Sequence, residues 1–392
     1  MTERLYRDDP YLLEFEARVV ARTDHDGRPA VILDRTAFYP EAGGQPWDTG
    51  TLSGVAVVAA LEKDGDVLHV LEAPLPADAV AGRVDGERRR DHRQQHHGQH
   101  LLSRALVKAA GARTLSFHLG ADASTVDLDR EVAEAQLRDA ERLANEIVWA
   151  GHPVRVVEVS PSEARDRGVE PPRDAGDRVR LVEAEGFDIQ PCGGTHPRST
   201  SEVGVVLVLG RERYKSGSRV RFVCGHRALR AARERVVATD RLGALLSSPL
   251  PGLVEAAERQ AAELAATQKR VVELRRQAIE LEATRLLAGT PERPVVVAAF
   301  DGRPPEELRL LAQALVAARP CVALLASRAE RVHLVFAQSD GLPHDVPSLL
   351  REAVARLGGK GGGRGNLAQG SGDTADGLDA ALAFAAARVR NA

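Results

Sequence analysis

The chain has 392 residues, enough for two or three domains that each bury a core of their own. Hydrophobic residues make up 43% and charged residues 28%, which is ordinary globular usage and excludes a disordered, collagen-like or purely coiled-coil chain. A net charge of −3 gives no general attraction to nucleic acid, so any polyanion must be bound by a local basic patch. The three cysteines are far apart and the N-terminus lacks the apolar stretch of a signal peptide, so we expect a cytoplasmic protein with no membrane partner.

Residues 15–73 are predicted to consist mainly of β-strands. Apolar stretches predict strands at 29–33, 55–61 and 67–71. The last two flank an Asp64-Gly65 pair, which is typical of a two-residue hairpin turn. A small β-rich module therefore opens the chain.

Helical spacing replaces the strand pattern in the next segment. Apolar residues recur with helical spacing over 91–110, with Gly111 as a stop, and a second helix is expected at about 130–150. Residues 153–159 and 203–209 have the apolar composition of buried strands. The proline- and glycine-rich stretch between these two strands is predicted to be a loop.

Two helices are predicted next, at 226–246 and 253–288, separated by a break that contains Pro249 and Pro251. The longer helix carries an apolar seam with spacings of seven and three, formed by Leu264, Val271, Leu274, Ala278 and Leu281. Such a seam suits a helical hairpin or a homodimer, and the pattern does not choose between them.

The last part of the chain alternates between strands and helices and predicts a compact α/β domain. The strands are expected at 295–300, 321–326 and 332–337, and the helices near 306–318, 347–357 and 376–390. A glycine cluster at 358–370 lies before the last helix.

Two pairs of residues have the spacing of metal ligands. His96 and His100 are four residues apart on a predicted helix, so their imidazoles leave the same face one turn apart. Cys192 and His196 form a second pair on the glycine-bearing loop. Together the pairs supply three imidazoles and one thiolate, a set suited to one tetrahedral Zn²⁺ ion per chain. A zincin protease would need a glutamate beside His96, and a base deaminase would need a second cysteine three residues after Cys192; neither is present.

The residues around both pairs resemble a known family. Residues 93–102 (RQQHHGQHLL), the CGGTH run at 192–196 and the glycine-rich run at 38–50 (FYPEAGGQPWDTG) resemble the editing domain of alanyl-tRNA synthetases. No aminoacylation domain precedes these motifs, so the resemblance is to the free-standing, long-form alanyl-tRNA editing proteins. The glycine cluster at 358–370 resembles a segment of the DHHA1 domain.

This resemblance implies an α+β protein with four parts. They are an N-terminal β-barrel-like module (1–90), a zinc-bearing α+β editing domain (91–225), a helical hairpin or coiled-coil linker (226–289) and a C-terminal α/β DHHA1-like, tRNA-binding domain (290–392). The implied activity is hydrolysis, in trans, of the ester that joins serine or glycine to alanine tRNA. Such a second site is needed because an alanine-sized pocket rejects glycine weakly and rejects one added hydroxyl by only about 10²-fold.

The same resemblance implies roles for individual residues. Gln45 would position the reacting group, next to Gly43, Gly44 and Asp48 of the glycine-rich motif. Relatives usually carry Thr or Ser after the first metal histidine, where this chain has His97, so we treat His97 as a candidate catalytic residue. This difference leaves the amino-acid preference open, and the catalytic base is also open.

The zinc ion has two alternative roles. Four protein ligands would close its coordination shell, as in a structural site, whereas a lengthened bond would open a position for water or substrate. The alternative to a deacylase is therefore a non-catalytic tRNA- or RNA-binding protein with a structural zinc.

Basic residues predict where tRNA would bind. Segment 211–235 holds nine basic residues against two acidic ones, and segment 83–93 lies close to the metal histidines. The candidates for tRNA contact are Lys215, Arg219 and Arg221, together with Lys360, Arg364, Asn366 and Gln369 of the DHHA1-like segment.

Overall fold

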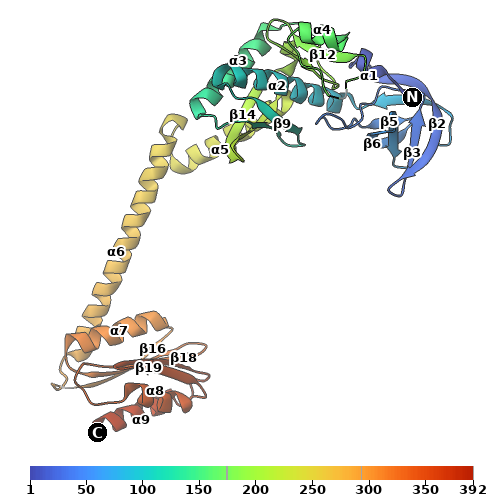
Figure 1. Cartoon of the computed structure of the whole chain (residues 1–392). Helices are drawn as coiled ribbons and strands as arrows, with labels where there is room; N and C mark the ends of the chain where they lie inside the picture. The colour runs from blue at the N-terminus through green and yellow to red at the C-terminus, as the bar shows by residue number, and fades with distance from the viewer. Residues whose placement is uncertain (174, 293, 392) are drawn as a thin grey trace. The chain divides into compact units, whose positions relative to one another are not determined.

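The computed structural model describes residues 1–173, 175–292 and 294–391. It confirms a mixed α+β protein, and its contacts divide the chain into two compact units, Met1–Leu242 and Gly243–Ala392 (Figure 1). Within the described residues, no helix is at once long and apolar enough to span a membrane.

The first unit opens with six strands that close into a ring, in the order β2-β3-β7-β6-β5-β8. Their bounds are β2 (Glu14–His25), β3 (Arg28–Leu33), β5 (Gly50–Leu52), β6 (Val55–Lys63), β7 (Asp66–Leu71) and β8 (Ala79–Val84). The short elements β1 (Glu3–Arg4), α1 (Leu5–Asp8) and β4 (Arg35–Thr36) lie beside the ring. The predicted turn is confirmed, with Asp64 and Gly65 at φ values of 51° and 85°.

Helix α2 (Gly86–Ala110) follows the ring and begins about five residues earlier than predicted. Its start is fixed by Asp85, whose carboxylate accepts hydrogen bonds from the backbone N–H groups of Glu87 and Arg88. Its end is the predicted one, with Gly111 in the left-handed conformation.

Helices α2 and α3 (Glu134–Ala150) pack on a four-stranded sheet in the order β14-β15-β10-β9. Its strands are β9 (Thr114–Leu119), β10 (Ser124–Leu128), β14 (Val206–Tyr214) and β15 (Gly217–Cys224). Leu101, Leu106 and Phe222 are fully buried in the core that the helices and the sheet share. The C-terminal half of α2 is therefore held rigidly at the centre of this unit.

The segment between α3 and β14 differs most from the prediction. It contains a three-stranded sheet, β11 (Val154–Val159), β12 (Val179–Ala184) and β13 (Asp188–Pro191), with two short helices, α4 (Pro161–Asp166) and η1 (Thr200–Val203). The strand predicted at 153–159 is confirmed as β11, but its predicted burial is wrong, because β11 lies at the edge of this sheet and Val156 is 40% exposed. Within the described residues, the expected loop is reduced to two stretches, 167–173 with 175–178 before β12, and the residues after Pro191.

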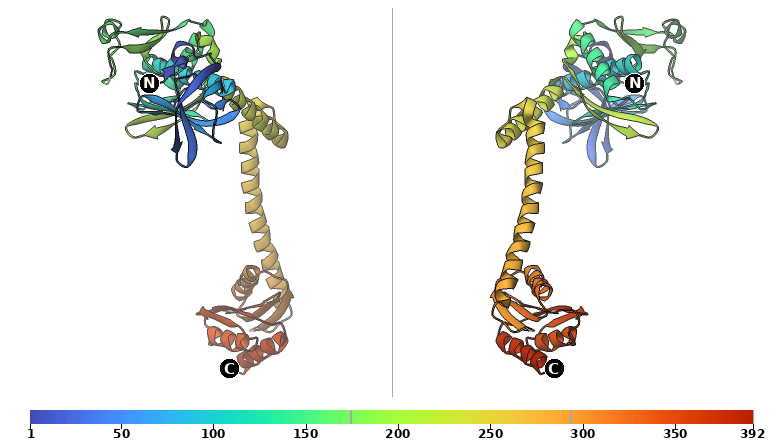
Figure 2. Two further views of the ribbon diagram at one scale, coloured as in Figure 1. Left: turned by 90° about the vertical axis from the view of Figure 1, so that its right-hand side faces the viewer. Right: turned by 90° about the vertical axis from the view of Figure 1, so that its left-hand side faces the viewer.

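Helices α5 (Gly225–Leu246) and α6 (Leu253–Leu287) flank the predicted break, which contains the short helix η2 (Leu250–Gly252). Figure 2 shows α6 as one continuous helix. The apolar seam faces solvent, with Leu264 59%, Leu274 47% and Leu281 54% exposed. The choice between a hairpin and a homodimer therefore stays open.

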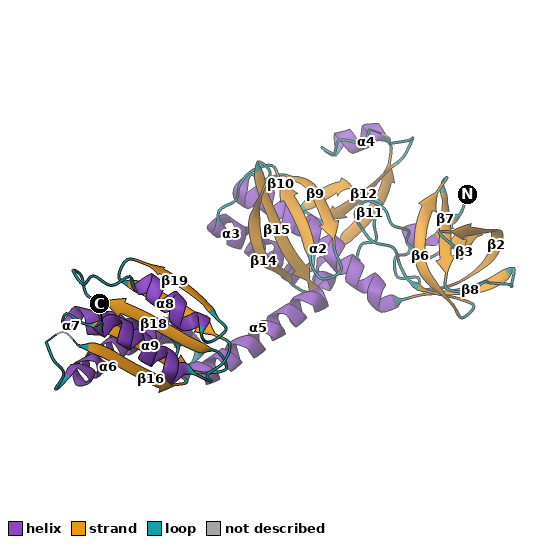
Figure 3. Ribbon diagram, turned by 90° about the horizontal axis from the view of Figure 1, so that it is seen from below, coloured by secondary structure: helices purple, strands orange, loops and turns teal. Residues whose placement is uncertain are grey.

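The second unit contains a five-stranded sheet in the order β16-β17-β18-β20-β19 (Figure 3). Its elements are β16 (Val295–Asp301), α7 (Pro305–Ala318), β17 (Val322–Arg328), β18 (Val332–Gln338), α8 (Val346–Ala355), β19 (Lys360–Arg364), β20 (Leu367–Gly372) and α9 (Leu378–Arg390). Helices α8 and α9 pack on one face, and α7 and the end of α6 pack on the other.

The glycine cluster at 358–370 forms a β-hairpin, β19 and β20, that was not predicted as strands. A Cβ on Gly361 would lie 2.9 Å from Leu350 of α8 and 2.8 Å from the backbone of Gly370. Glycine is required there because the strand backbone and the helix approach so closely.

Candidate metal centre

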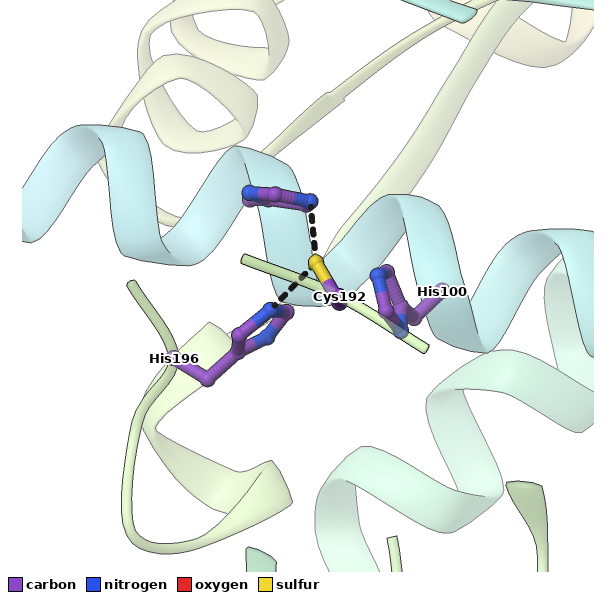
Figure 4. A group of neighbouring side chains, drawn as sticks. His100, Cys192 and His196 are labelled. Atoms are coloured by element: carbon purple, nitrogen blue, oxygen red, sulfur yellow. Dashed lines mark hydrogen bonds between the residues drawn. The ribbon is translucent and has the colours of Figure 1, made fainter. Parts of the chain in front are cut away.

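The four predicted ligand residues converge in the first unit. One ligand atom from each of His96, His100, Cys192 and His196 lies within 4.8 Å of those of the other three. Figure 4 shows His100 on α2, with Cys192 and His196 approaching from the loop that follows β13. The cluster joins segments that are 96 residues apart in the chain.

The cluster faces inward and is held by hydrogen bonds through sulfur. The Cys192 Sγ atom lies 3.3 Å from His96 Nε2 and 3.2 Å from His196 Nε2, and it accepts the backbone N–H of Gly194 at 3.4 Å. The three imidazoles are almost fully buried, with exposures of 1% for His96, 4% for His100 and 1% for His196. The three imidazoles and the sulfur thus form one compact donor set.

The loop comes this close to α2 because Gly194 has no side chain. A Cβ at this position would lie 2.2 Å from His96 Cε1 and 3.0 Å from Gln45 Oε1. The neighbouring Gly193 has nothing within 4 Å of the same position. Only the second glycine of the motif is thus required by packing against the histidine.

Gln45 lies behind His96, where the sequence resemblance placed it close to the centre. Its Oε1 lies 2.8 Å from His96 Nδ1 and accepts the backbone N–H of Thr195 at 3.1 Å, while its Nε2 donates to Thr195 Oγ1 at 2.9 Å. Because His96 Nδ1 is the hydrogen-bond donor to Gln45, Nε2 is the nitrogen left free for an ion. Gln45 therefore sets the tautomer and ties the glycine-rich segment to the CGGTH loop.

His97 lies behind His196 in a similar way. The two Nδ1 atoms are 3.1 Å apart, and His97 is 1% exposed. When a cation is bound at His196 Nε2, His196 Nδ1 would carry the proton and donate a hydrogen bond to His97 Nδ1. His97 thus contacts a candidate ligand, and its Nε2 has no partner among the described residues.

Two further residues of the centre were missed by the sequence analysis. Asp188 on β13 places Oδ2 3.9 Å from His100 Nδ1. Arg180 on β12 donates to the backbone carbonyls of Cys192 at 2.7 Å and of Gly194 at 3.1 Å, which fixes the loop. Both residues lie in the sheet that was predicted to be a loop, so no pattern connected them with the histidines.

Burial sets the protonation of the imidazoles. Loss of solvent lowers the pKa of His96 and of His97 to about 3, and it lowers the pKa values of His100 and His196 well below the usual value. All four rings are therefore neutral near pH 7, which is the form that binds metals. Burial raises the pKa of the Cys192 thiol, so the thiol of the metal-free protein is protonated and would lose its proton to a bound cation.

The glycine-rich segment is anchored at one end and exposed at the other. Asp48 is fully buried; it accepts the backbone N–H of Tyr39 at 2.7 Å and a hydrogen bond from Arg89 Nε at 2.9 Å. Gly43 and Gly44 form the exposed tip, at φ values of 55° and 80°. Asp48 thus fixes the segment, and its carboxylate does not reach the metal cluster.

The basic segment 211–235 is less cationic than its sequence indicates, because acidic residues of other elements form ion pairs with its arginines. Arg219 makes two hydrogen bonds with Asp127, at 2.6 and 2.9 Å, and Arg211 and Arg213 pair with Glu134 and Glu131. Lys215 and Arg221 are exposed, and neither has an ion pair with a described residue.

The residues predicted to contact tRNA in the second unit lie on the β19–β20 hairpin. Lys360 and Arg364 alternate with core-facing residues of β19, and Gln369 lies opposite Gly362 between them, so these three side chains share one face. Asn366 is already engaged, because Nδ2 donates to Asp340 at 2.6 Å and Oδ1 accepts from Gln338 at 2.8 Å.

Comparison with known proteins agrees with this architecture. Residues 179–222, which include two of the four metal-site residues, match the family described as the threonyl and alanyl tRNA synthetase second additional domain. Residues 292–391 match the DHHA1 domain. The fold and the centre thus define a chain that combines a domain of threonyl and alanyl tRNA synthetases with a DHHA1 domain.

Whole-chain relatives are more specific. The alanyl-tRNA editing protein AlaX-L of Pyrococcus horikoshii is 32% identical over 385 residues, which cover 94% of this chain and 94% of the relative. The alanine–tRNA ligase of Pyrococcus furiosus is 33% identical over 94% of this chain, which spans only 42% of the ligase. A crystal structure of the C-Ala domain from Aquifex aeolicus alanyl-tRNA synthetase shares 32% identity over 23% of this chain and 85% of that domain, with a TM-score of 0.22. The chain belongs to the family of alanyl-tRNA editing proteins.

Proposed function

We propose that the protein hydrolyses, in trans, the ester bond of alanine tRNA that carries serine or glycine. The observation that carries this proposal is the convergence of His96, His100, Cys192 and His196 in a member of the editing family. The products are the free amino acid and the tRNA with its terminal hydroxyl restored, and water supplies the cleaving oxygen.

We propose zinc as the ion at this centre, with one ion per chain. Three neutral imidazoles and one thiolate are a donor set typical of zinc, and softer and harder metals fit it less well. Bound there, the ion would act as a Lewis acid toward the ester or lower the pKa of a water molecule. Gln45 and His97 keep the rings of His96 and His196 in the tautomer that presents Nε2 to the cluster.

The burial of the centre supports a second candidate function. Four protein ligands, of which the three histidines are nearly inaccessible to solvent, also describe a structural zinc site, in which case the chain would bind tRNA without catalysis. The two functions differ in turnover, so a rate measurement separates them.

For tRNA binding we propose the exposed Lys215 and Arg221 in the first unit and the shared face of Lys360, Arg364 and Gln369 in the second. Arg219 is a weaker candidate than its sequence context indicated, because Asp127 already engages it. All three cysteines are free thiols, which fits a reducing compartment such as the cytoplasm, where tRNA is charged.

Deacylation assays test the proposal directly. Seryl-, glycyl- and alanyl-tRNA are incubated with the full-length protein, with and without a chelator, and the remaining ester is measured. We expect the seryl or glycyl ester to be cleaved and the alanyl ester to be spared, with activity lost on chelation and restored by zinc. Equal rates on all three esters, or full activity of folded protein shown to be metal-free, would overturn the proposal.

A further inference from the structure

Arg93 on α2 is a buried cation with free hydrogen-bond donors. Its side chain is 8% exposed, yet Nε and Nη1 have no hydrogen-bond partner among the described residues. Burial lowers its pKa, as expected for a cation that has lost solvent without gaining an anion. Burying an unpaired charged group costs free energy, so its presence in a native structure indicates a compensating role such as ligand binding.

Neighbouring arginines of segment 83–93 do not share this property. Arg89 donates to Asp48 and to the carbonyls of Pro10 and Ala37, and Arg88 donates to the carbonyl of Trp47 at 2.9 Å. These two arginines therefore hold the fold together. Arg93 has an equally fixed position with no such bonds, because its guanidinium stacks on the Tyr11 ring, 3.7 Å from the centroid.

A small cavity lies beside the guanidinium of Arg93. Its volume is ≈150 Å³, and it is lined by Arg90, Arg93, Gln94, Pro197 and Glu202. The one acid in the wall is already engaged, since Glu202 accepts hydrogen bonds from the Tyr11 hydroxyl at 2.7 Å and from the backbone N–H of Arg198 at 3.1 Å. Two arginines against one bonded carboxylate leave the cavity with a positive charge that suits an anion.

The cavity lies next to the candidate metal centre along both elements that build the centre. Arg93 precedes His96 and His97 by about one turn of α2, roughly 5.4 Å along the helix axis. Pro197 directly follows the metal-site residue His196. Both elements that hold the metal-site residues therefore also contribute to the wall of this cavity.

We propose that Arg93, assisted by Arg90, binds a backbone phosphate at the 3′ end of the tRNA acceptor strand. The guanidinium of Arg93 carries a planar charge, and its stack on Tyr11 fixes its orientation. Its Nε and Nη1 atoms are closed off from water, so a phosphate in the cavity would meet Nη2 first. The phosphate contact carries no sequence information; it sets the register that brings the terminal ester to the metal cluster. This inference rests on the proposed deacylase function, because it places the substrate of that reaction.

The test uses the full chain and compares Arg93→Gln with Arg142→Gln. Arg142 is an exposed arginine on α3, paired with Glu146, and serves as the matched control for loss of one charge. One measurement is the binding of uncharged alanine tRNA over a range of salt concentrations. The other is the hydrolysis of two small esters, 3′-seryl-adenosine and the same compound with a 5′-phosphate.

For wild type we expect faster hydrolysis of the phosphorylated ester, and for Arg93→Gln a loss of about tenfold in that preference, as for one hydrogen bond to a charged group. The slope of log affinity against log salt should fall by about 0.7 to 0.9 in Arg93→Gln and stay unchanged in Arg142→Gln. If Arg93→Gln does not fold, Arg90→Gln, an exposed residue of the same cavity, takes its place with the same expected direction.

An unchanged salt slope together with an equal loss on both esters would overturn the phosphate site and make Arg93 a purely structural residue. Unchanged tRNA affinity in Arg93→Gln would overturn it as well. If wild type left seryl- and glycyl-tRNA intact, the proposed function would fail, and the tRNA binding measurement would still decide the role of Arg93.

Discussion

Gly194 is the residue whose backbone packs most closely against a candidate metal ligand, the imidazole of His96. Gly194→Ala should displace His96, because the new Cβ would lie 2.2 Å from Cε1 of the imidazole. We expect metal affinity to fall by at least about tenfold, the lower end of the range for disturbed metal-ligand support. Competition with a chromophoric chelator measures it.

Gly193→Ala is the matched control, since nothing lies within 4 Å of its added Cβ. Its metal affinity should equal that of wild type. Equal losses in both variants would show that the loop tolerates no substitution for reasons other than contact with His96.

His97 allows a second test at the residue scale. Removing the acceptor behind His196 in His97→Ala should weaken metal binding by about 10- to 100-fold, whereas His97→Asn keeps an acceptor and should recover part of the loss. The affinity is measured with the same chelator, and His226→Ala, which changes an exposed histidine, is the control. Wild-type affinity in His97→Ala would contradict the positioning role.

The candidate ligands could be predicted from the sequence, but most of their supports could not. Helical spacing predicts His96 and His100 as ligands, and a short loop motif predicts Cys192 and His196. Asp188 and Arg180 come from strands that bear no local mark of the centre, and only the fold brings them to His100 and to the CGGTH loop.

At the scale of elements, the junction between the strand ring and α2 depends on the Asp48–Arg89 ion pair. Both side chains are fully buried, so Asp48→Ala would leave the Arg89 cation without its counter-ion inside the protein. We expect a loss of about 3–5 kcal/mol in the free energy of unfolding, measured with urea.

The control for this prediction is Asp78→Ala. Asp78 pairs with Arg22 at 2.7 Å, but its side chain is 86% exposed, so its loss should cost at most about 1 kcal/mol. A loss of similar size in both variants would contradict the anchoring role of Asp48.

Elements with one clear period were predicted well, and those without one were not. Helix α2 and the hairpin around Asp64-Gly65 have strong local signals, and both are confirmed. Strands β12 and β13 are separated from β11 by a proline- and charge-rich segment, which indicated a loop. Strands β19 (KGGGR) and β20 (LAQGSG) were not predicted, because glycine has a low strand propensity and neither segment alternates apolar and polar residues.

At the scale of the whole molecule, buried neutral histidines make the stability depend on pH. Burial lowers the pKa of His69 to about 4, and the unfolded chain binds the same proton near pH 6.5. Between about pH 6.5 and pH 4 the unfolded state therefore binds a proton that the folded state does not bind. The free energy of unfolding falls as the pH falls through this window.

Unfolding of the metal-free protein at several pH values between 7.5 and 4.5 measures this effect. For His69 alone the loss of stability approaches about 1.4 kcal/mol per pH unit, and His69→Gln should reduce the total slope by this amount. His92 and the four buried histidines of the metal centre, whose pKa values burial also lowers, make up the slope that remains. Stability that rose on acidification would contradict the assignment of these rings as neutral.

The charge of the whole chain shows why sequence alone overestimates its basic surface. The nine basic residues of 211–235 form a strong local cluster, but Asp127, Glu131 and Glu134 approach it from other elements of the first unit. A count of charged residues within one segment does not show ion pairs with distant segments. The sequence therefore predicted tRNA contact equally for Arg219, which is paired, and for Arg221, which is not.

The central claim is that one ion, held by the four converging side chains, is the centre of the deacylase. X-ray absorption at the zinc edge, on full-length protein purified without added metal, tests this claim most directly. We predict one zinc per chain, surrounded by three nitrogen scatterers and one sulfur scatterer, with the sulfur absent in Cys192→Ser. Zinc bound only through oxygen, or a sulfur signal that persists in Cys192→Ser, would contradict it.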